Sequence, residues 1–300
     1  MNFKHLKYFV ATAETGQVSR AAKLLSISQS AVTGSVRDLE ALLAVTLFQR
    51  RAQGMELTDA GREFLPVARD ILEKVDAAHQ IHRGTSDITG SLTIAATYTV
   101  LGYFLPFHLG RLAQLYPGID IRIVELNRQS IEEQLLRGQI DMAVALTSNI
   151  HRDGIETLTL LKSPRRLWVP AGHRFCDGGA VSLHSIAKEP YVMLTVDEAA
   201  HSSMKYWNSN NAHPSIKLRT SSVEAVRSLV ANGQGVTILS DMVYRPWSLE
   251  GRRIETVVTD VEIPTMDVGL AVNRSIPLTP AKQALKSYFT SAFLSPKLQF

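Results

Sequence analysis

"SRAAKLLSISQSAVTGSVRDLE", residues 19–40, holds two short helical patterns with only a few residues between them. Ala22 and Leu25 form the apolar edge of the first pattern. The second repeats apolar residues at steps of four, three and four, the spacing of one helix face: Val32, Val36, Leu39 and Leu43. Ser28 precedes it and is a good N-cap, because its hydroxyl can accept from a free backbone N–H of the first turn. Two helices joined by a tight turn around a small shared core form a helix-turn-helix.

The second helix has small polar side chains opposite its apolar face: Gln29, Ser30, Thr33 and Arg37, with Gly34 among them. A helix that enters the major groove of DNA needs short side chains, so that its backbone can approach, and polar groups that reach base edges and phosphates. An isolated polar stripe is more often a solvated helix face, so the neighbouring segments must decide between the two interpretations. With the segment that follows, we predict that these four residues contact DNA.

That segment is "LFQRRAQGMELTDAG", residues 47–61, in which two short apolar-centred runs flank the basic turn "RRAQG". The pattern predicts a β-hairpin whose tip carries Arg50 and Arg51. Arginines on a hairpin beside a groove-reading helix can hold the sugar–phosphate backbone. The formal net charge of +4 and the pI of about 9.2 are compatible with such a polyanionic partner but do not establish it.

A long helix is predicted over about 59–84, with Thr58 as its cap. It carries a heptad-like seam: Leu65, Ala68, Leu72, Val75, His79 and His82. A helix of this length with little else to pack against would leave the seam in water, so we expect it to pair with a second copy of the chain. The two histidines have no Cys or further His nearby, and we predict no metal site.

Composition bounds the remaining possibilities. The chain has 300 residues, of which 45% are hydrophobic and 20% charged, so compact units with real cores are expected. A single cysteine, Cys176, cannot form an internal disulfide, and "MNFKHLKYF" lacks the apolar run of a secretion signal. No segment has the roughly 18 uninterrupted apolar residues that span a bilayer. We therefore expect a reducing, cytoplasmic location.

After the polar stretch "HRGTSDITGS", residues 82–91, strand-like and helix-like runs alternate to the end of the chain. The first runs are "SLTIAAT", a single long helix from "VLGYFLPFHLGRLAQLYPG", "IDIRIVEL", "SIEEQLLRGQ" and "IDMAVAL". The alternation restarts near "RRLWVPAG" and finishes with "MDVGLAVN" and a helix. Such alternation predicts parallel βαβ units, here arranged as two α/β lobes joined by crossing strands.

The N-terminal part resembles the LysR-type transcriptional regulators almost end to end, over residues 6–65. The resemblance is carried by "AAKLLSISQSAVT", the following "LE", "LF.R" before the hairpin and "LT.AG" at the start of the long helix. One departure is Gly34, where the family commonly has Arg, Lys or Gln, so operator preference cannot be transferred from relatives. The resemblance continues more loosely to the C-terminus.

The resemblance implies a winged helix-turn-helix DNA-binding domain over residues 1–58, a linker helix and hinge for dimerisation over 59–90, and an effector-binding domain over 91–300. The last is expected to be a two-lobed α/β fold like a periplasmic binding protein, with lobe I at about 91–162 and 267–300 and lobe II at about 163–266. The chain would cross between lobes near Ser163 and near 264–267. The resemblance also implies a homodimer or homotetramer and contact with RNA polymerase.

Ligands of two-lobed proteins sit in the cleft between the lobes. Hydroxyls and free N–H groups at strand-to-helix junctions would form a receptor there for a small effector, such as an organic acid or an aromatic compound. The candidates at these junctions are Thr97, Thr99, Asn127, Ser130, Thr195, His201, Ser202 and Ser222. For most of them ordinary helix capping is an equal alternative. Asp197 and Glu198 would repel an anion near the cleft unless they face water in a first helical turn.

Enzyme classes find little support. The sequence has no G-x-S-x-G elbow, no H-E-x-x-H and no P-loop, and "GQG" at 233–235 lacks the rest of a dinucleotide site. Cys176 lies near His173, but a lone loop cysteine without an organised base is seldom a nucleophile. We predict no enzymatic activity and no cofactor. The alternatives to an effector-controlled regulator are a solute-binding receptor, which leaves residues 1–90 unexplained, and a constitutive DNA-binding protein, which leaves 91–300 unexplained.

Overall fold

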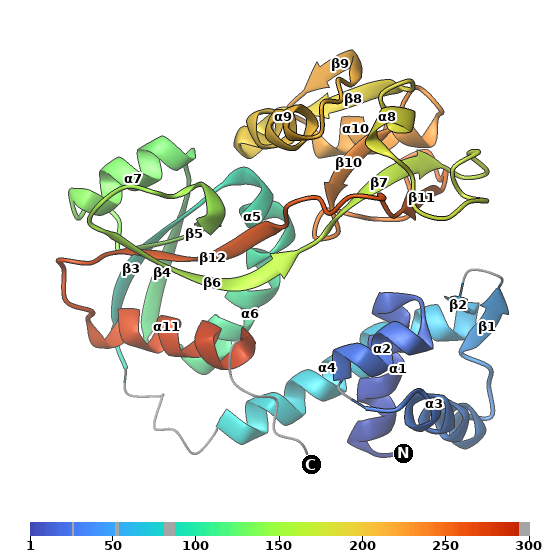
Figure 1. Cartoon of the computed structure of the whole chain (residues 1–300). Coiled ribbons are helices and arrows are strands. Elements are labelled where there is room, and N and C mark those ends of the chain that lie inside the picture. The colour runs from blue at the N-terminus through green and yellow to red at the C-terminus, as the bar shows by residue number, and fades with distance from the viewer. Residues whose placement is uncertain (26, 52–53, 81–87, 294–300) are drawn as a thin grey trace. The chain divides into compact units, whose positions relative to one another are not determined.

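The computed structural model of the chain describes residues 1–25, 27–51, 54–80 and 88–293 (Figure 1). The chain divides into two compact units, Met1–Gly84 and Thr85–Phe300.

The first unit is a helix-turn-helix followed by a hairpin and a long helix, as predicted. Its elements are α1 (Phe3–Thr15), α2 (Val18–Leu25), α3 (Gln29–Leu43), β1 (Phe48–Arg51), β2 (Gly54–Leu57) and α4 (Asp59–Gln80). The predicted apolar faces form its core, in which Val32 and Leu39 are fully buried and Ile27 packs at the edge. The Ser28 hydroxyl caps α3 by accepting from the Ala31 N–H at 3.2 Å. Local periodicity and capping therefore predict this unit well.

Part of the expected dimer seam on α4 is used inside the unit. Ala68 is fully buried in the helix-turn-helix core, and Leu65 and Leu72 pack against that core from the same face of α4. An ion pair of 3.0 Å between Arg69 and Glu14 also ties α4 to α1. The prediction that this stretch has little else to pack against is therefore wrong. Residues 81–84, the His79 side chain and all of His82 lie outside the described structure.

The second unit begins with a lobe built on a five-stranded sheet of order β4-β3-β5-β12-β6. Its elements are β3 (Gly90–Ala96), α5 (Tyr98–Tyr103), α6 (Leu105–Leu115), β4 (Ile119–Glu125), α7 (Arg128–Leu136), β5 (Met142–Leu146), a 3-10 turn (Thr147–Asn149), β6 (Ile155–Ser163), β12 (Met266–Asn273) and α11 (Pro280–Phe293). Successive residues of a strand face opposite sides of a sheet. Met142 and Val144 accordingly pack in the core that contains α6 and α11, and Ala143 packs in the core that contains α7.

The other lobe contains a three-stranded sheet of order β10-β7-β11 and a parallel pair, β8-β9. Its elements are β7 (Arg165–Pro170), α8 (Leu183–Ile186), β8 (Pro190–Leu194), a 3-10 turn (Val196–Glu198), α9 (Ala199–Ser209), β9 (Ser215–Thr220), α10 (Val223–Ala231), β10 (Thr237–Ser240) and β11 (Ile254–Val257). One core contains α8 and α9, and a second contains α10. We call the two lobes lobe I and lobe II.

Two details of the sequence-based interpretation require correction. The helix expected over 100–118 is two helices, because the backbone turns at Phe104 and Pro106 lies in the first turn of α6. The strands are also not all parallel, since β7 pairs antiparallel with β10 and β11, and β12 pairs antiparallel with β5 and β6. β7 and β12 follow the two crossings between lobes, so no helical crossover sets their direction.

The crossings lie side by side (Figure 1) and are linked by polar contacts. The Arg165 guanidinium donates to the carbonyl oxygens of Pro264 and Thr265, which lie on the returning segment. The buried Ser163 hydroxyl accepts from the Ser240 hydroxyl at 2.7 Å and from the Met242 N–H at 3.0 Å. These bonds restrain the connection about which the lobes would move relative to each other.

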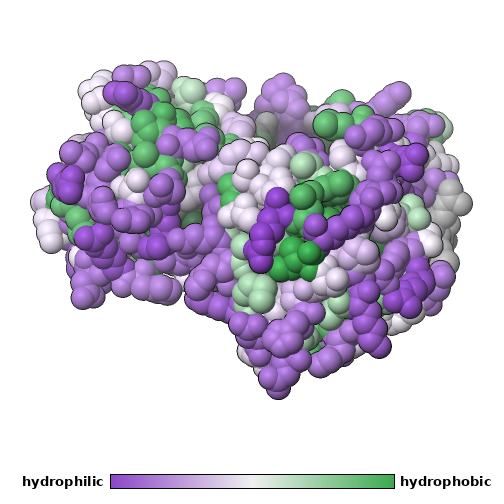
Figure 2. Space-filling model, turned by 90° about the horizontal axis from the view of Figure 1, so that it is seen from above, coloured by the Kyte–Doolittle hydropathy of each residue, from purple (hydrophilic) through white to green (hydrophobic). Residues whose placement is uncertain are grey.

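The face shown in Figure 2 is mostly hydrophilic, and its hydrophobic residues form separate patches. Within the described residues, none of the helices combines the length and the apolar character that crossing a bilayer requires.

Candidate functional site

The outer face of α3 carries the residues predicted to contact DNA. Gln29, Ser30 and Arg37 are exposed, and Thr33 is half-buried. The Thr33 hydroxyl donates to the Gln29 carbonyl at 2.9 Å, which leaves its oxygen able to accept a further hydrogen bond. A Cβ added at Gly34 would meet nothing within 4 Å, so α3 presents a narrow surface at its middle. These groups can donate to and accept from base edges and phosphates.

The hairpin beside α3 is held by hydrogen bonds to both neighbouring segments. Oε1 of Glu40, near the end of α3, accepts from the N–H groups of Leu47 at 2.7 Å and Phe48 at 3.1 Å. At the other strand, the Met55 N–H donates to the Gly16 carbonyl at 2.8 Å. Arg50 and Arg51 lie on β1, next to the turn, but their side chains and residues 52–53 lie outside the described structure. Glu40 was not among the predicted residues, although it belongs to the quoted "LE" pair.

In the second unit, α5 of lobe I is bonded to lobe II near both ends. At its start, the Thr99 N–H donates to Oδ2 of Asp197 at 2.7 Å. At its end, the Tyr103 hydroxyl donates to Oε1 of Glu224 at 3.0 Å, and the Arg245 guanidinium lies 5.7 Å from the centroid of the Tyr103 ring. Burial opposes ionisation of Glu224, but hydrogen bonds from Arg227 and Tyr103 hold the pKa of its carboxyl below the usual value.

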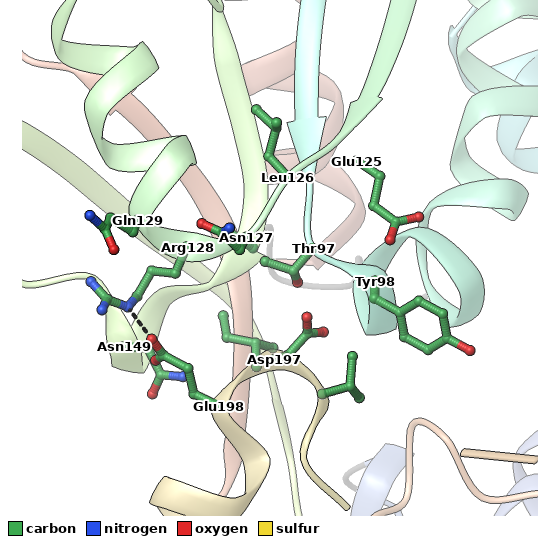
Figure 3. Close-up of a pocket in the computed structure, with 13 residues that line it drawn as sticks. Thr97, Tyr98, Glu125, Leu126, Asn127, Arg128, Gln129, Asn149, Asp197 and Glu198 are labelled. Atoms are coloured by element: carbon green, nitrogen blue, oxygen red, sulfur yellow. Dashed lines mark hydrogen bonds and ion pairs between the residues drawn. The ribbon is translucent and has the colours of Figure 1, made fainter. Parts of the chain in front are cut away.

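A pocket of about 340 Å³ lies in this cleft (Figure 3). Lobe I lines it with the junctions that follow β3, β4 and β5, and lobe II with the turn Val196–Glu198. Thr97 points into the pocket, with Tyr98 and Glu125 on one side and Arg128 and Gln129 on the other. A smaller cavity of about 30 Å³ shares part of its lining and extends toward Thr99, Ser202 and Arg165.

The eight predicted cleft residues divide into two groups. Thr97 and Asn127 line the larger pocket, and Thr99 and Ser202 line the smaller cavity. The others line neither of these two cavities: Ser130, Thr195, His201 and Ser222.

The four residues of the second group lie outside both cavities, either at helix starts or exposed on the surface. The Ser222 hydroxyl caps α10 by accepting from the Ala225 N–H at 3.1 Å, and the Ser130 N–H donates to the cap residue Asn127 at 2.9 Å. Thr195 and His201 are exposed. Capping thus accounts for the Ser222 hydroxyl, as the alternative interpretation allowed, whereas the cap beside Ser130 is the side chain of Asn127.

Asp197 and Glu198 lie in a helical turn, as the alternative allowed, but this 3-10 turn is at the cleft and both residues line the larger pocket. Both have left-handed backbones, with φ of 50° and 62°. Oε1 of Glu198 accepts from Nε of Arg128 at 2.8 Å, and Oε1 of Glu132 accepts from Nη1 of the same guanidinium at 2.9 Å. The hydrogen bonds to Glu132 and Glu198 raise the pKa of Arg128 above its usual value. Arg128 lies between Asn127 and Ser130, the two residues of the 127–130 junction that sequence reasoning singled out.

The environment of Cys176 differs from that of a nucleophile. Burial, assisted by a hydrogen bond involving Glu255, raises the pKa of the Cys176 thiol to about 11. A thiol with so high a pKa is protonated at neutral pH and reacts slowly. Across the part of the chain that the structure describes, no three His, Cys, Asp or Glu side chains are grouped so that they could hold a metal ion.

Two family models match the chain. Residues 3–62 match the bacterial regulatory helix-turn-helix protein of the lysR family, and residues 85–294 match the LysR substrate binding domain. The RuBisCO operon transcriptional regulator of Allochromatium vinosum is 27% identical over 294 residues, which cover 97% of this chain and 96% of that protein.

Solved structures agree with these matches. HinK, a LysR family transcriptional regulator from Pseudomonas aeruginosa, is 27% identical with a TM-score of 0.63, covering 96% of this chain and 97% of that one. A second LysR family structure from Pseudomonas aeruginosa, described as a putative regulator, is also 27% identical, with a TM-score of 0.64 and coverage of 97% and 98%.

The matches explain both halves of the chain, so neither a solute receptor alone nor a DNA-binding protein without a ligand domain fits. The prediction of no enzymatic activity is confirmed, because the family consists of transcriptional regulators. With its helix-turn-helix and its substrate-binding domain, the chain belongs to the LysR family of transcriptional regulators.

Proposed function

We infer that α3 reads DNA sequence through Gln29, Ser30, Thr33 and Arg37, and that Arg50 and Arg51 hold the phosphate backbone on the hairpin. The observation that carries this proposal is the exposed polar face of α3, opposite the buried Val32, Val36 and Leu39. The open space at Gly34 supports it, because a bulky side chain there would keep the helix away from the groove floor.

We further infer that a small molecule binds in the cleft pocket and changes how the protein binds its operator. The contacts that cross the cleft support this, since a ligand that alters them has different affinities for different arrangements of the lobes. The sequence predicts an organic acid or an aromatic compound. The charged residues that line the pocket determine which sign of ligand charge it favours. DNA binding belongs to residues 1–58, dimerisation to the linker helix and hinge at 59–90, and effector binding to 91–300.

Assembly and cellular partners complete the proposal. A homodimer or homotetramer would place two helix-turn-helix units on two half-sites of an operator. Because Leu65, Ala68 and Leu72 pack inside the first unit, the α4 contact between copies would use other residues, such as Val67, which is 51% exposed. We also expect contact with RNA polymerase and a cytoplasmic location.

The experiment begins with selection of the preferred duplex from a random pool, followed by affinity measurements over a range of salt. Thr33→Ala should change the preferred bases, whereas Arg50→Ala with Arg51→Ala should weaken binding to every duplex and reduce the salt slope. Lys217→Ala with Arg219→Ala, which removes two exposed charges from β9, is the matched control. Equal effects of the first two variants on every sequence would refute the separate roles.

A further inference from the structure

The cleft pocket has an excess of negative charge. Its lining includes three carboxylates, those of Glu125, Asp197 and Glu198, against a single guanidinium, that of Arg128. That guanidinium already donates to two carboxylates, through Nε to Glu198 and through Nη1 to Glu132, which balance its positive charge. An anion entering the pocket would therefore meet a lining whose carboxylates outnumber its one cation.

One backbone N–H that could attract an anion, that of Thr99, is also engaged. Asp197 accepts from the Thr99 N–H at 2.7 Å, so a carboxylate of the protein already holds that donor. An external anion would have to displace Asp197 and remain beside it in the same cleft. This arrangement disfavours the organic acid that the sequence predicts.

The Thr97 hydroxyl is a polar group of the pocket whose hydrogen-bonding capacity is unused within the described residues. Thr97 is only 4% exposed, and among the residues that the structure describes its hydroxyl has no hydrogen-bond partner. Figure 3 shows this side chain pointing into the pocket, toward the side where Asp197 lies. A buried hydroxyl without a partner carries a free-energy cost, which a ligand that bonds to it would remove.

The remaining lining suits a cation on a short aliphatic chain. The Tyr98 side chain lines the pocket on the same side as Glu125, and its ring extends away from Thr97 (Figure 3). Leu126, Ala145, Leu146 and Val196 add apolar surface for methylene groups. The volume of about 340 Å³ lies at the small end of the ~300–1,000 Å³ range of ligand sites.

We propose that the effector is a small organic cation, an ammonium or guanidinium compound on a short aliphatic chain. Its charged group lies between Asp197 and Glu125 and donates to the Thr97 hydroxyl oxygen. This inference rests on the proposal that the pocket is the effector site, and it names the chemical class that the site selects.

The test is calorimetric titration of the full chain, at constant ionic strength, with probes of similar length and opposite charge. The cations are 1,4-diaminobutane and agmatine, the anions are succinate and adipate, and 1,4-butanediol is the neutral reference. We expect binding of at least one cation and of neither anion. Binding of an anion would overturn the proposal, as would binding of none of the four ions.

Isosteric variants locate the binding. Glu125→Gln and Asp197→Asn should each weaken cation binding about 10-fold, because each removes one charge-assisted hydrogen bond. Asp120→Asn removes a carboxylate from the same strand as Glu125, outside the pocket lining, and should leave the affinity unchanged. Because Glu125 is exposed, its variant is expected to fold even if Asp197→Asn loosens the lobes. Equal affinities of all three variants would place the cation elsewhere and overturn the proposal.

A DNA-binding measurement separates this inference from the proposed function. If the cation binds in the pocket without changing operator affinity or the DNA footprint, the proposal that the pocket regulates DNA binding is refuted. The proposal that its ligand is a cation is then supported. If an anion binds there and changes the footprint, the regulatory role stands and the ligand class fails.

Discussion

The carboxylate of Asp197 in lobe II accepts a hydrogen bond from the backbone N–H of Thr99 in lobe I, at 2.7 Å. Asp197 reaches this position with a left-handed backbone, φ 50°, which a residue other than glycine adopts at a cost. The surrounding contacts must offset that cost. The turn Val196–Glu198 thus fastens lobe II to the first turn of α5.

Removing this carboxylate should loosen the start of α5. Asp197→Gly removes the carboxylate acceptor, and glycine adopts the left-handed backbone conformation at lower cost. More frequent local opening in this variant would therefore result from the lost hydrogen bond and not from backbone strain. A hydrogen bond to a charged group contributes about 1.5–3 kcal/mol, so we expect the Thr99 amide to exchange with deuterium at least ~10-fold faster. Asp197→Asn retains a neutral acceptor and should show a smaller increase. An unchanged exchange rate in Asp197→Gly would mean that the contact does not hold α5.

Glu40 should position the hairpin for DNA binding. Its Oε1 accepts from the N–H groups of Leu47 and Phe48, and Glu40→Ala would leave both donors without this acceptor. We expect a loss of about 1–3 kcal/mol in stability of the first unit and weaker binding to all duplexes. Glu40→Gln removes the same negative charge but keeps an oxygen acceptor, so it separates anchoring from electrostatics. If both variants bind DNA equally well in anisotropy titrations, the anchoring role is excluded.

The helix-turn-helix could be predicted from sequence because its determinants are local. Val32, Val36 and Leu39 mark one face of α3 by spacing alone, and Ser28 marks its start. The break between α5 and α6 was missed although Pro106 was a visible signal, because the long apolar run masked it. The prediction that the α4 seam has little else to pack against failed for a different reason. A heptad-like spacing shows that a face is apolar, but it does not show which surface covers that face.

The cleft was predicted only in outline. Strand-to-helix junctions indicate which segments approach a cleft, and Thr97 and Asn127 came from that rule. The rule does not distinguish a capping hydroxyl from one that faces a cavity, which is why Ser222 was included. The pairing of Arg128 with Glu198 joins residues 70 positions apart, and the left-handed backbone at Asp197 depends on tertiary contacts. Neither feature produces a hydrophobic periodicity or a motif from which it could be predicted.

Gly34 should limit the stability of the first unit. It lies in the middle of α3, and an added Cβ would meet nothing within 4 Å, so Gly34→Ala should stabilise the unit by about 1 kcal/mol through helix propensity. Gly61→Ala is the matched comparison at another helical glycine, where the added Cβ would lie 2.1 Å from the Leu47 carbonyl oxygen. That variant should be destabilised. Thermal unfolding of the full chain measures both, and a destabilised Gly34→Ala would contradict the open geometry around α3.

His108 should make the second unit sensitive to acid. Burial, with a smaller contribution from Arg111, lowers the pKa of His108 to about 4, and its Nδ1 lies 2.9 Å from the Tyr288 hydroxyl. An unfolded histidine has a pKa of about 6.5, so between these values the unfolded chain binds a proton that the folded chain does not. The neutral His108 therefore makes its full contribution to the free energy of unfolding above pH ~6.5. That free energy falls by up to about 3 kcal/mol as the pH drops toward 4.

Substitution of His108 tests this assignment. The ring packs against those of Phe104, Phe289 and Phe293, so His108→Phe should fit the site and flatten the dependence of the unfolding midpoint on pH between 6.5 and 4.5. His184 is exposed on α8, and His184→Asn should leave the dependence as it is in the parent chain. Denaturant titrations at a series of pH values provide the comparison. If His108→Phe loses stability toward low pH as steeply as the parent, other groups carry the acid sensitivity, and the buried imidazole is not its source.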